Sequence, residues 1–185
     1  MSVAGVLLAA GAGSRFLGPT HKLLADFKGR PLIEVSLEPL LAAGFDEVIV
    51  VSGAIDLVDH VPEVVTIIEN HDWERGQASS LQAAVHYLER MGHETMIIGL
   101  ADQPFVTTEA WQAVSATEGD IVTAVFDGQR RPPVKLDQIT WPLLPLDGDQ
   151  GARGLFRSRP DLVHEVACEG KPFDIDTQED LERWS

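Results

Sequence analysis

A glycine-rich segment that directly follows an apolar strand is the feature that most constrains this chain. Val3 to Leu8 form an unbroken apolar run, which is typical of a strand buried on both faces of a parallel sheet. The segment Ala9-Ala10-Gly11-Ala12-Gly13-Ser14-Arg15 follows, with Lys22 downstream. The two glycines let backbone N–H groups approach an anion and permit positive φ. Because Arg15 and Lys22 add positive charge, the segment predicts a polyphosphate site.

This local positive charge contrasts with the charge of the whole chain. The 185 residues include 29 acids and carry a formal net charge of −15, yet no Asp or Glu precedes Asp26. A chain this acidic is not expected to bind nucleic acid, so an anionic ligand must be held by local charge. For the glycines alone, an ordinary solvated turn remains an alternative.

Two better-known phosphate-binding loops fit the segment poorly. A Walker A loop requires Gly-Lys-Ser/Thr, but Gly13 is followed by Ser14 and Arg15. The dinucleotide fingerprint G-x-G-x-x-G has Phe16 at its third glycine. It also needs an acid at the end of the second strand, where Ser52 stands. A dinucleotide-binding oxidoreductase therefore stays open only as a weak alternative.

The order of apolar runs predicts an α/β fold built on a mostly parallel sheet. The expected strands are Val3–Leu8, Glu47–Ser52, Val64–Ile68, Thr95–Leu100 and Ile121–Phe126. The expected helices are Pro31–Ala43, kinked or shortened by Pro39, then Ala78–Arg90, Thr107–Thr117 and a last helix that begins at Thr177 with Asp180 as its capping acid. A hydrophobic content of 44% suits one core, so residues 1–185 are expected to form a single domain.

The cellular setting follows from cysteine usage and hydropathy. Cys168 is the single cysteine, and we expect a buried thiol in a reducing compartment. No signal peptide and no apolar run of membrane-spanning length is present in the sequence. We therefore expect a soluble cytoplasmic protein with no membrane association.

Three acids are candidate metal ligands. Asp102 directly follows the expected strand Thr95–Leu100, and functional groups collect beyond the carboxyl edges of parallel strands. A carboxylate there, near Arg15 and Lys22, is suited to hold Mg²⁺ against phosphate oxygens, although it alternatively caps the turn before Pro104. Asp174 and Asp176 alternate, so at most one is expected to reach a metal, and the other to cap the next helix.

Several motifs together resemble a known family. They are Leu8-Ala9-Ala10-Gly11-x-Gly13-x-Arg15 with Lys22, Gly29 and Pro31, Gly76-Gln77-Ala78-Ser79-Ser80-Leu81, Asp102-Gln103-Pro104, Gly148-Asp149-Gln150-Gly151-Ala152-Arg153, and Asp174 to Leu181. In this order they are similar to nucleotidyltransferases that attach NMP to a phosphorylated acceptor. Within that group the chain resembles molybdenum cofactor cytidylyltransferase and the related guanylyltransferase-like NTP transferases.

The resemblance implies a fold, a reaction and partners. The fold would be a Rossmann-like three-layer sandwich of the nucleotide-diphospho-sugar transferase type. The reaction would be Mg²⁺-dependent transfer of CMP from CTP to the phosphate of a molybdopterin-type cofactor, with release of pyrophosphate. Ala10 stands where guanylyltransferases of the family usually carry glycine, and residues Gly76 to Leu81 are similar to the cytidylyl type, which favours CTP. Transient contact with a molybdoenzyme or its chaperone is also implied.

The resemblance also implies roles for particular residues. Arg15, Lys22 and Asp102 would be catalytic, with Asp102 and Asp176 holding the metal and Asp174 as the fallback. The nucleotide would contact Leu8, Ala9, Ala10, Gly11, Gly13, Arg15, Lys22, Gly76, Ser79, Ser80 and Leu81. Ser79 and Ser80 alternatively cap the helix that begins at Ala78.

The acceptor side is the least specified part of the pattern. Arg130, Arg131 and Lys135 surround Pro132 and Pro133, and Arg153 follows a glycine-rich turn, so either group is a candidate for the acceptor's phosphate. Equally, they are ordinary solvated bases. Arg131-Pro132-Pro133 departs from the Gly-His-Pro that the family often has. Transfer to another phosphorylated acceptor, and a non-catalytic nucleotide sensor, remain alternatives.

Overall fold

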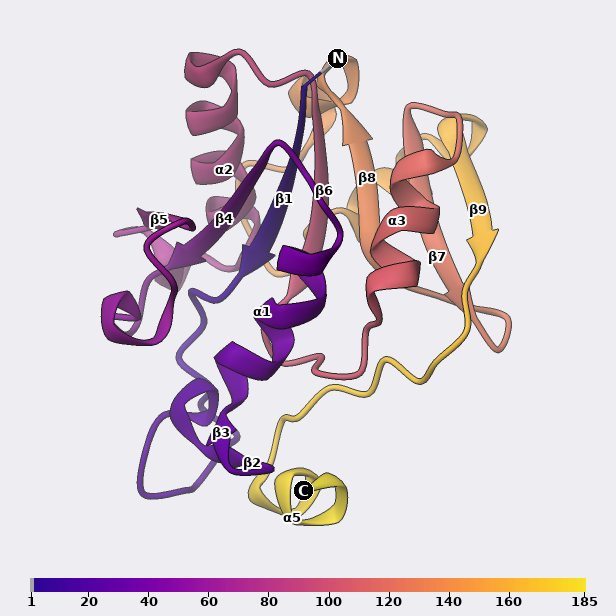
Figure 1. The fold of residues 1–185 in the computed structure, drawn as a ribbon. Helices are drawn as coiled ribbons and strands as arrows, with labels where there is room; N and C mark the ends of the chain where they lie inside the picture. The colour runs from indigo at the N-terminus through magenta and orange to yellow at the C-terminus, as the bar shows by residue number, and fades with distance from the viewer. Residues whose placement is uncertain (1) are drawn as a thin grey trace.

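Seven strands form one sheet in the computed structural model, which describes residues 2–185 (Figure 1). The strands are β1 (Val3–Leu8), β4 (Glu47–Ser52), β5 (Thr66–Glu69), β6 (Thr95–Leu100), β7 (Ile121–Phe126), β8 (Gln129–Asp137) and β9 (Val163–Ala167). Their order is β5-β4-β1-β6-β8-β7-β9, and β8 is antiparallel to both neighbours while the other pairs are parallel. The expected mostly parallel sheet is confirmed.

Helices cover both faces of this sheet, so the α/β sandwich is also confirmed (Figure 1). Helices α1 (Leu32–Ala42) and α3 (Thr108–Ala116) pack on one face, and α2 (Gln77–Met91) and α4 (Arg153–Ser158) on the other. Residues of β1 alternate between the two cores, which explains its unbroken apolar sequence. The remaining elements are the β2 (Asp26–Phe27) and β3 (Arg30–Pro31) pair, α5 (Gln178–Trp184), and the 3₁₀ turns η1 (Lys22–Leu24), η2 (Val58–His60), η3 (Trp73–Arg75), η4 (Gln138–Leu143) and η5 (Pro160–Leu162).

Several boundaries differ from the sequence-based expectation. β5 begins at Thr66, two residues after Val64, and α1 begins at Leu32 and continues through Pro39. β8 and β9 were not predicted. The sequence did not predict β8, because Pro132 and Pro133 lack the N–H that a sheet ladder requires. In the structure the pairing with β7 shifts register between Thr123 and Ala124, so that the two prolines have no partner residue on β7.

Two further expectations concern burial. Cys168 was expected to be buried, but its side chain is only half-buried. Its thiol donates to Val166 O at 3.7 Å, and burial raises the pKa of the thiol. Across residues 2–185, no helix has both the length and the apolar character needed to cross a membrane.

A partly buried polar network joins the elements at the edge of the sheet where β4 begins. Glu47 Oε1 accepts hydrogen bonds from Thr66 Oγ1 at 2.6 Å and Tyr87 OH at 2.7 Å, and Oε2 lies 2.7 Å from His93 Nε2. His93 Nδ1 in turn lies 2.8 Å from Ser2 Oγ. Burial raises the pKa of Glu47, but these hydrogen bonds outweigh burial and lower it overall. The network therefore stabilises the ionised carboxylate.

We expect Glu47→Gln to lower the free energy of unfolding by about 1–3 kcal/mol at pH 7, because an amide group replaces an acceptor that faces several donors. The folded pKa lies below the ordinary value of 4.5. The stabilisation is therefore complete above that pH and is lost as the pH falls through the folded value. Urea unfolding at pH 7 and below pH 4.5 measures both effects, with exposed Glu63→Gln as control. An equal cost at both pH values would contradict this account.

Candidate functional site

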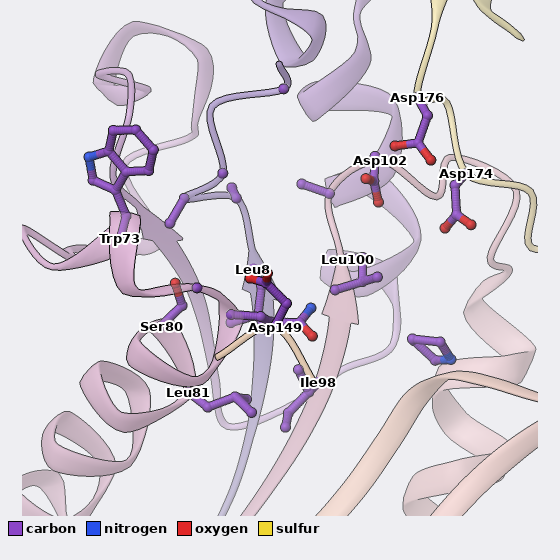
Figure 2. A pocket seen from close by; sticks show the side chains of 18 of the residues that line it. Leu8, Trp73, Ser80, Leu81, Ile98, Leu100, Asp102, Asp149, Asp174 and Asp176 are labelled. Carbon is purple, nitrogen blue, oxygen red and sulfur yellow. The ribbon is translucent and has the colours of Figure 1, made fainter. Parts of the chain in front are cut away.

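The site lies where β1 and β6 end side by side. Leu8 and Leu100 are partners in the parallel register, and Ala101 N donates to Leu8 O at 3.0 Å. Beyond these ends the chain surrounds a cleft of about 890 Å³. Figure 2 shows Asp102, Asp174 and Asp176 gathered at one part of the cleft, with Ser80, Leu81 and Trp73 across from them. Both phosphate-binding and carboxylate candidates thus border the same space.

His21 connects the two ends of the loop after β1 through hydrogen bonds of its ring. Its Nδ1 accepts from Leu23 N at 3.2 Å, so Nε2 carries the proton and donates to Gly11 O at 3.0 Å. Burial lowers the pKa of His21, and adjacent Lys22 lowers it further. Gly13 has a φ of +62°, and a Cβ there would lie 3.1 Å from Lys22 Cγ. Positive φ was expected at both glycines of the loop; it occurs at Gly13 but not at Gly11.

Lys22 lies between two of the three candidate carboxylates. Its Nζ donates to Asp102 Oδ2 at 2.7 Å and to Asp176 Oδ1 at 3.1 Å, and its side chain is only 11% exposed. Arg15 Nη2 lies 3.0 Å from the same Asp176 oxygen, although the Arg15 side chain is 73% exposed. The structure therefore brings together the four charged residues Arg15, Lys22, Asp102 and Asp176 that the sequence suggested.

Burial and charge oppose each other in this cluster. Burial raises the pKa of Asp102, and nearby Asp174 and Asp176 raise it further; the lowering by Lys22 does not cancel these effects. Burial lowers the pKa of Lys22, but Asp102 and Asp176 outweigh burial and raise it overall. Lys22 is therefore charged at neutral pH, while the ionised form of Asp102 is disfavoured. An additional cation would relieve this imbalance.

The donor atoms are suitable for a hard divalent cation. Asp102 Oδ1 is buried without a hydrogen-bond partner in the described part of the chain, and Asp102 lines the cleft. Carboxylate oxygens are the ligands that Mg²⁺ and Mn²⁺ prefer. Within residues 2–185 no three His, Cys, Asp or Glu side chains form a ready-made metal cluster, and Lys22 stands between Asp102 and Asp176. Asp102 Oδ1 is open to a cation, and a cation that also bound Asp176 would compete with Lys22 for that carboxylate.

The start of α2 forms the other wall of the cleft. Gly76 precedes the helix with a φ of +93°, and a Cβ there would lie 2.5 Å from Asp149 Oδ1. The loop that carries Asp149 is held against this helix start, because Ala78 N donates to Gly148 O at 2.9 Å and Gly148 N donates to Arg75 O at 3.0 Å. Side chains from the first turns of α2 that border the cleft include Ser80 and Leu81. The positive end of the helix dipole thus lies at the cleft.

The two adjacent serines of α2 have different environments. Ser79 Oγ donates toward Asp72 O and Gly76 O, both at 2.9 Å, and is not among the residues that line the cleft. Ser80 does line the cleft. Asn70 Nδ2 donates to both hydroxyl oxygens, at 2.9 Å to Ser79 and 3.0 Å to Ser80. The capping alternative is wrong, because Gly76 is the N-cap of α2 and no side chain makes a capping hydrogen bond there. The contacts of Ser79 are structural, and they leave Ser80 as the better candidate for a ligand contact.

The basic residues of β8 separate into two groups. Arg130 and Arg131 line the cleft, together with Arg153 from α4. Arg131 Nη1 lies 3.5 Å from Asp174 Oδ2, and Arg130 Nε lies 2.5 Å from Glu165 Oε1. Lys135 Nζ instead donates to Thr117 O at 2.8 Å at the end of α3, outside the cleft lining. Lys135 is therefore a structural residue and is withdrawn as an acceptor-binding candidate.

Three residues support the site in roles that the sequence did not assign to them. They are His21, Asn70 and Gln103, whose Nε2 donates to Asp174 Oδ1 at 2.7 Å. Gln103 was part of a motif, but its partner is 71 residues away. Asn70 and His21 had no sequence signal, because each acts through a fold-dependent hydrogen bond.

Comparison with known proteins shows the family of this chain. Residues 5–164 match the model of the MobA-like NTP transferase domain. The chain belongs to the MobA-like NTP transferase family. It is 36% identical to nicotine blue oxidoreductase of Paenarthrobacter nicotinovorans, over 98% of this chain and 95% of that protein. It is 32% identical to the purine catabolism protein PucB of Bacillus subtilis, over 96% and 93%.

The fold of the family is also found among solved structures. Rv0371c from Mycobacterium tuberculosis superimposes with a TM-score of 0.85 at 25% identity, covering 99% of this chain and 96% of that one. The family match includes the cleft residues Arg15, Lys22 and Asp102, but it ends before Asp174 and Asp176. Two of the three candidate carboxylates of this MobA-like chain thus lie beyond the matched region.

The serines of this MobA-like chain provide a paired test. We expect Ser79→Ala to lower the free energy of unfolding by about 1–2 kcal/mol, because it removes a hydroxyl that bonds two backbone carbonyls. Ser80→Ala is expected to weaken NTP binding by about tenfold, because it removes a cleft hydroxyl. Urea unfolding and titration calorimetry separate the two effects. A larger loss of NTP affinity in Ser79→Ala than in Ser80→Ala would reverse these assignments.

Proposed function

We propose that this chain is a Mg²⁺-dependent cytidylyltransferase that transfers CMP from CTP to the phosphate of a molybdopterin-type cofactor, with release of pyrophosphate. The observation that carries the proposal is the cluster in which Lys22 and Arg15 meet Asp102 and Asp176 within one cleft. Cations and carboxylates together suit a triphosphate with its metal. Membership of the MobA-like NTP transferase family supports the reaction class.

The two walls of the cleft suggest how CTP lies. Its triphosphate would extend toward Arg15 and Lys22, near the end of β1, and its base toward Ala10, Ser80 and Leu81. The preference for CTP rests on Ala10 and on the segment from Gly76 to Leu81, which resemble the cytidylyl type. Gly11 leaves open space where a Cβ would stand, which supports a close approach of phosphate to the loop.

Catalysis in this scheme depends on positioning and charge. An oxygen of the acceptor phosphate forms a bond to the α-phosphorus of CTP. The bond from that phosphorus to the oxygen between the α- and β-phosphates breaks, and this oxygen leaves with pyrophosphate. Two anions must come together, and negative charge develops on pyrophosphate. Lys22 and Arg15 would exchange their carboxylate contacts for phosphate oxygens and so stabilise the departing pyrophosphate. Gly13 gives the Lys22 side chain room to lie along the loop.

The metal would be held by Asp102, with Asp176 as the second carboxylate and Asp174 as the fallback. When bound, a divalent cation would neutralise charge on the phosphate oxygens. The unpartnered Asp102 Oδ1 supports this assignment. A structure of Rv0371c in complex with manganese shares the fold, with a TM-score of 0.83 at 22% identity over 100% of this chain and 98% of that one.

Three arginines of the cleft are candidate partners of the acceptor phosphate, and one of them pairs with Asp174. Arg130, Arg131 and Arg153 border the cleft. Arg131 pairs with Asp174 at 3.5 Å, a distance that leaves its guanidinium donors available to an anion. These arginines could equally bind another phosphorylated acceptor, so the choice of a pterin cofactor as the acceptor rests on the family resemblance.

An oxidoreductase is the second candidate, favoured by the name of the 36% identical relative. The loop after β1 weighs against a dinucleotide site. It leads into the 3₁₀ turn η1, whereas the fingerprint requires a helix start at the glycines. β4 ends at Ser52 without the acid that would bind a ribose.

The proposal is tested by thermal stabilisation with each NTP and Mg²⁺, followed by pyrophosphate release with a molybdopterin-type acceptor. We expect a preference for CTP and multiple turnovers. Stabilisation without turnover would indicate a nucleotide sensor, and a response to NADH without any response to NTPs would favour the oxidoreductase.

Asp102→Asn should abolish Mg²⁺-dependent transfer, because the neutral amide replaces the carboxylate. Its melting temperature should equal or exceed that of the parent protein, since burial disfavours the charge that is removed. Asp120→Asn is a control that lies outside the cleft lining. Turnover retained in Asp102→Asn would refute the metal assignment.

Lys22→Met should have opposite effects on two ligands. Without nucleotide, Mn²⁺ should bind about tenfold more tightly, because the competing ammonium is gone. CTP should bind more weakly, because a phosphate contact is lost. Electron paramagnetic resonance of free Mn²⁺ and calorimetry with CTP measure the two affinities. Weaker Mn²⁺ binding in Lys22→Met would show that Lys22 does not compete for the carboxylates.

A further inference from the structure

Aromatic side chains connect the two segments that carry the site's carboxylates. Phe105 lies three residues after Asp102, and Phe173 directly precedes Asp174. Trp184 of α5 contacts both rings: it stacks on Phe173 with centroids 4.7 Å apart and meets Phe105 edge-on at 5.7 Å. One side chain near the end of the chain therefore joins the β6 end to the C-terminal segment.

The same aromatic group extends into the body of the protein. Phe105 meets Phe27 edge-on at 5.7 Å, and Phe27 is buried in the core beneath α1. Lys28 Nζ lies 5.2 Å from the Phe27 ring centroid and 5.5 Å from that of Phe105. Trp184 is thus attached to a fixed part of the structure and not only to another surface loop.

A second set of contacts shows what this attachment controls. Ile175 is fully buried, and its N–H donates to Asp102 O at 2.8 Å. The flanking acids then face different partners: Asp174 accepts from Gln103, and Asp176 accepts from Lys22. The extended segment from Phe173 to Thr177 is therefore aligned with Asp102 by one buried side chain and one backbone hydrogen bond.

The segment has little regular structure of its own to hold it. Between β9 and α5 the described chain forms no helix or strand, and α5 has only seven residues (Figure 1). So short a helix is unstable in isolation. Thr177 and Asp180 form a capping box at its start, while Trp184 supplies aromatic packing at its end. Trp184, together with Leu181, is where α5 packs against the core, so it helps to order this segment.

We propose that Trp184 is a positioning residue, which holds Asp176 and Asp174 beside Asp102 by clamping α5 onto Phe105 and Phe173. This inference rests on the proposed function, because Asp176 matters for catalysis only if the cleft binds a metal nucleotide. Without Trp184 the segment would open locally, while the sheet and its two cores stay folded. The geometry of the carboxylates would be lost before the fold is.

The test compares Trp184→Ala with Trp184→Phe, which keeps a ring able to stack, and with Glu182→Ala, an exposed substitution in the same helix. Hydrogen exchange is measured at the amides of Ile175 and Thr177, and the affinity for Mn²⁺ with CTP is measured by calorimetry. In Trp184→Ala we expect exchange at these amides to be about tenfold faster or more, and Mn²⁺–CTP affinity about tenfold weaker. Exchange in β1 should not change, and the other two variants should resemble the parent protein.

The outcomes separate the two hypotheses. Unchanged exchange at Ile175 and Thr177 in Trp184→Ala would overturn the clamp, whatever the protein binds. Faster exchange with unchanged Mn²⁺–CTP affinity would also overturn it, because the segment would then not position the site. If the parent protein binds no metal nucleotide, the proposed function fails, and the positioning role fails with it even where exchange is faster. A fall in protection across β1 as well would assign Trp184 to general stability and refute the positioning role.

Discussion

The parallel pairing of β1 with β6 is the constraint on which the site depends. Since Leu8 and Leu100 are partners, the chain leaves both strands at the same edge of the sheet. The loop that leads to Lys22 and the turn that begins at Asp102 must then be neighbours, although the two residues are 80 positions apart. A slip of one residue would turn the buried side chains of β1 to the wrong cores. Hydrophobic burial on both faces therefore also fixes the position of the charges.

Burial and charge oppose each other in this cluster, and a bound cation would relieve that opposition. Burial disfavours the ionised form of Asp102, two neighbouring carboxylates add to this effect, and Lys22 offsets only part of it. In a chain of net charge −15, such a cluster has a cost in folding free energy. Functional sites often keep interactions of this kind, because a group tuned to bind a ligand is poorly satisfied in its absence.

Much of the fold was predictable from the sequence, because continuous apolar runs and helical periodicity are local signals. The end of β6 just before Asp102 and the loop after β1 belong to this class. β8 was not predictable in the same way, since Pro132 and Pro133 break the pattern and a register shift accommodates them. Nor could the sequence distinguish Ser79 from Ser80, or show that Lys135 lies at the end of α3. These distinctions depend on partners brought close only by the fold.

The alternating acids overturn a sequence-based expectation, because residues two positions apart on an extended chain face the same side. The sequence predicted that Asp174 and Asp176 point to opposite sides, with one of them capping the next helix. Thr177 and Asp180 form the cap, and both acids border the cleft. Because Ile175 points into the core between them, Asp176 meets Arg15 and Lys22 while Asp174 meets Arg131. The segment thus divides the cleft into two cationic sides. In the proposed reaction such a division would be useful, since the donor triphosphate and the acceptor phosphate are both anions whose charge must be offset before they can react.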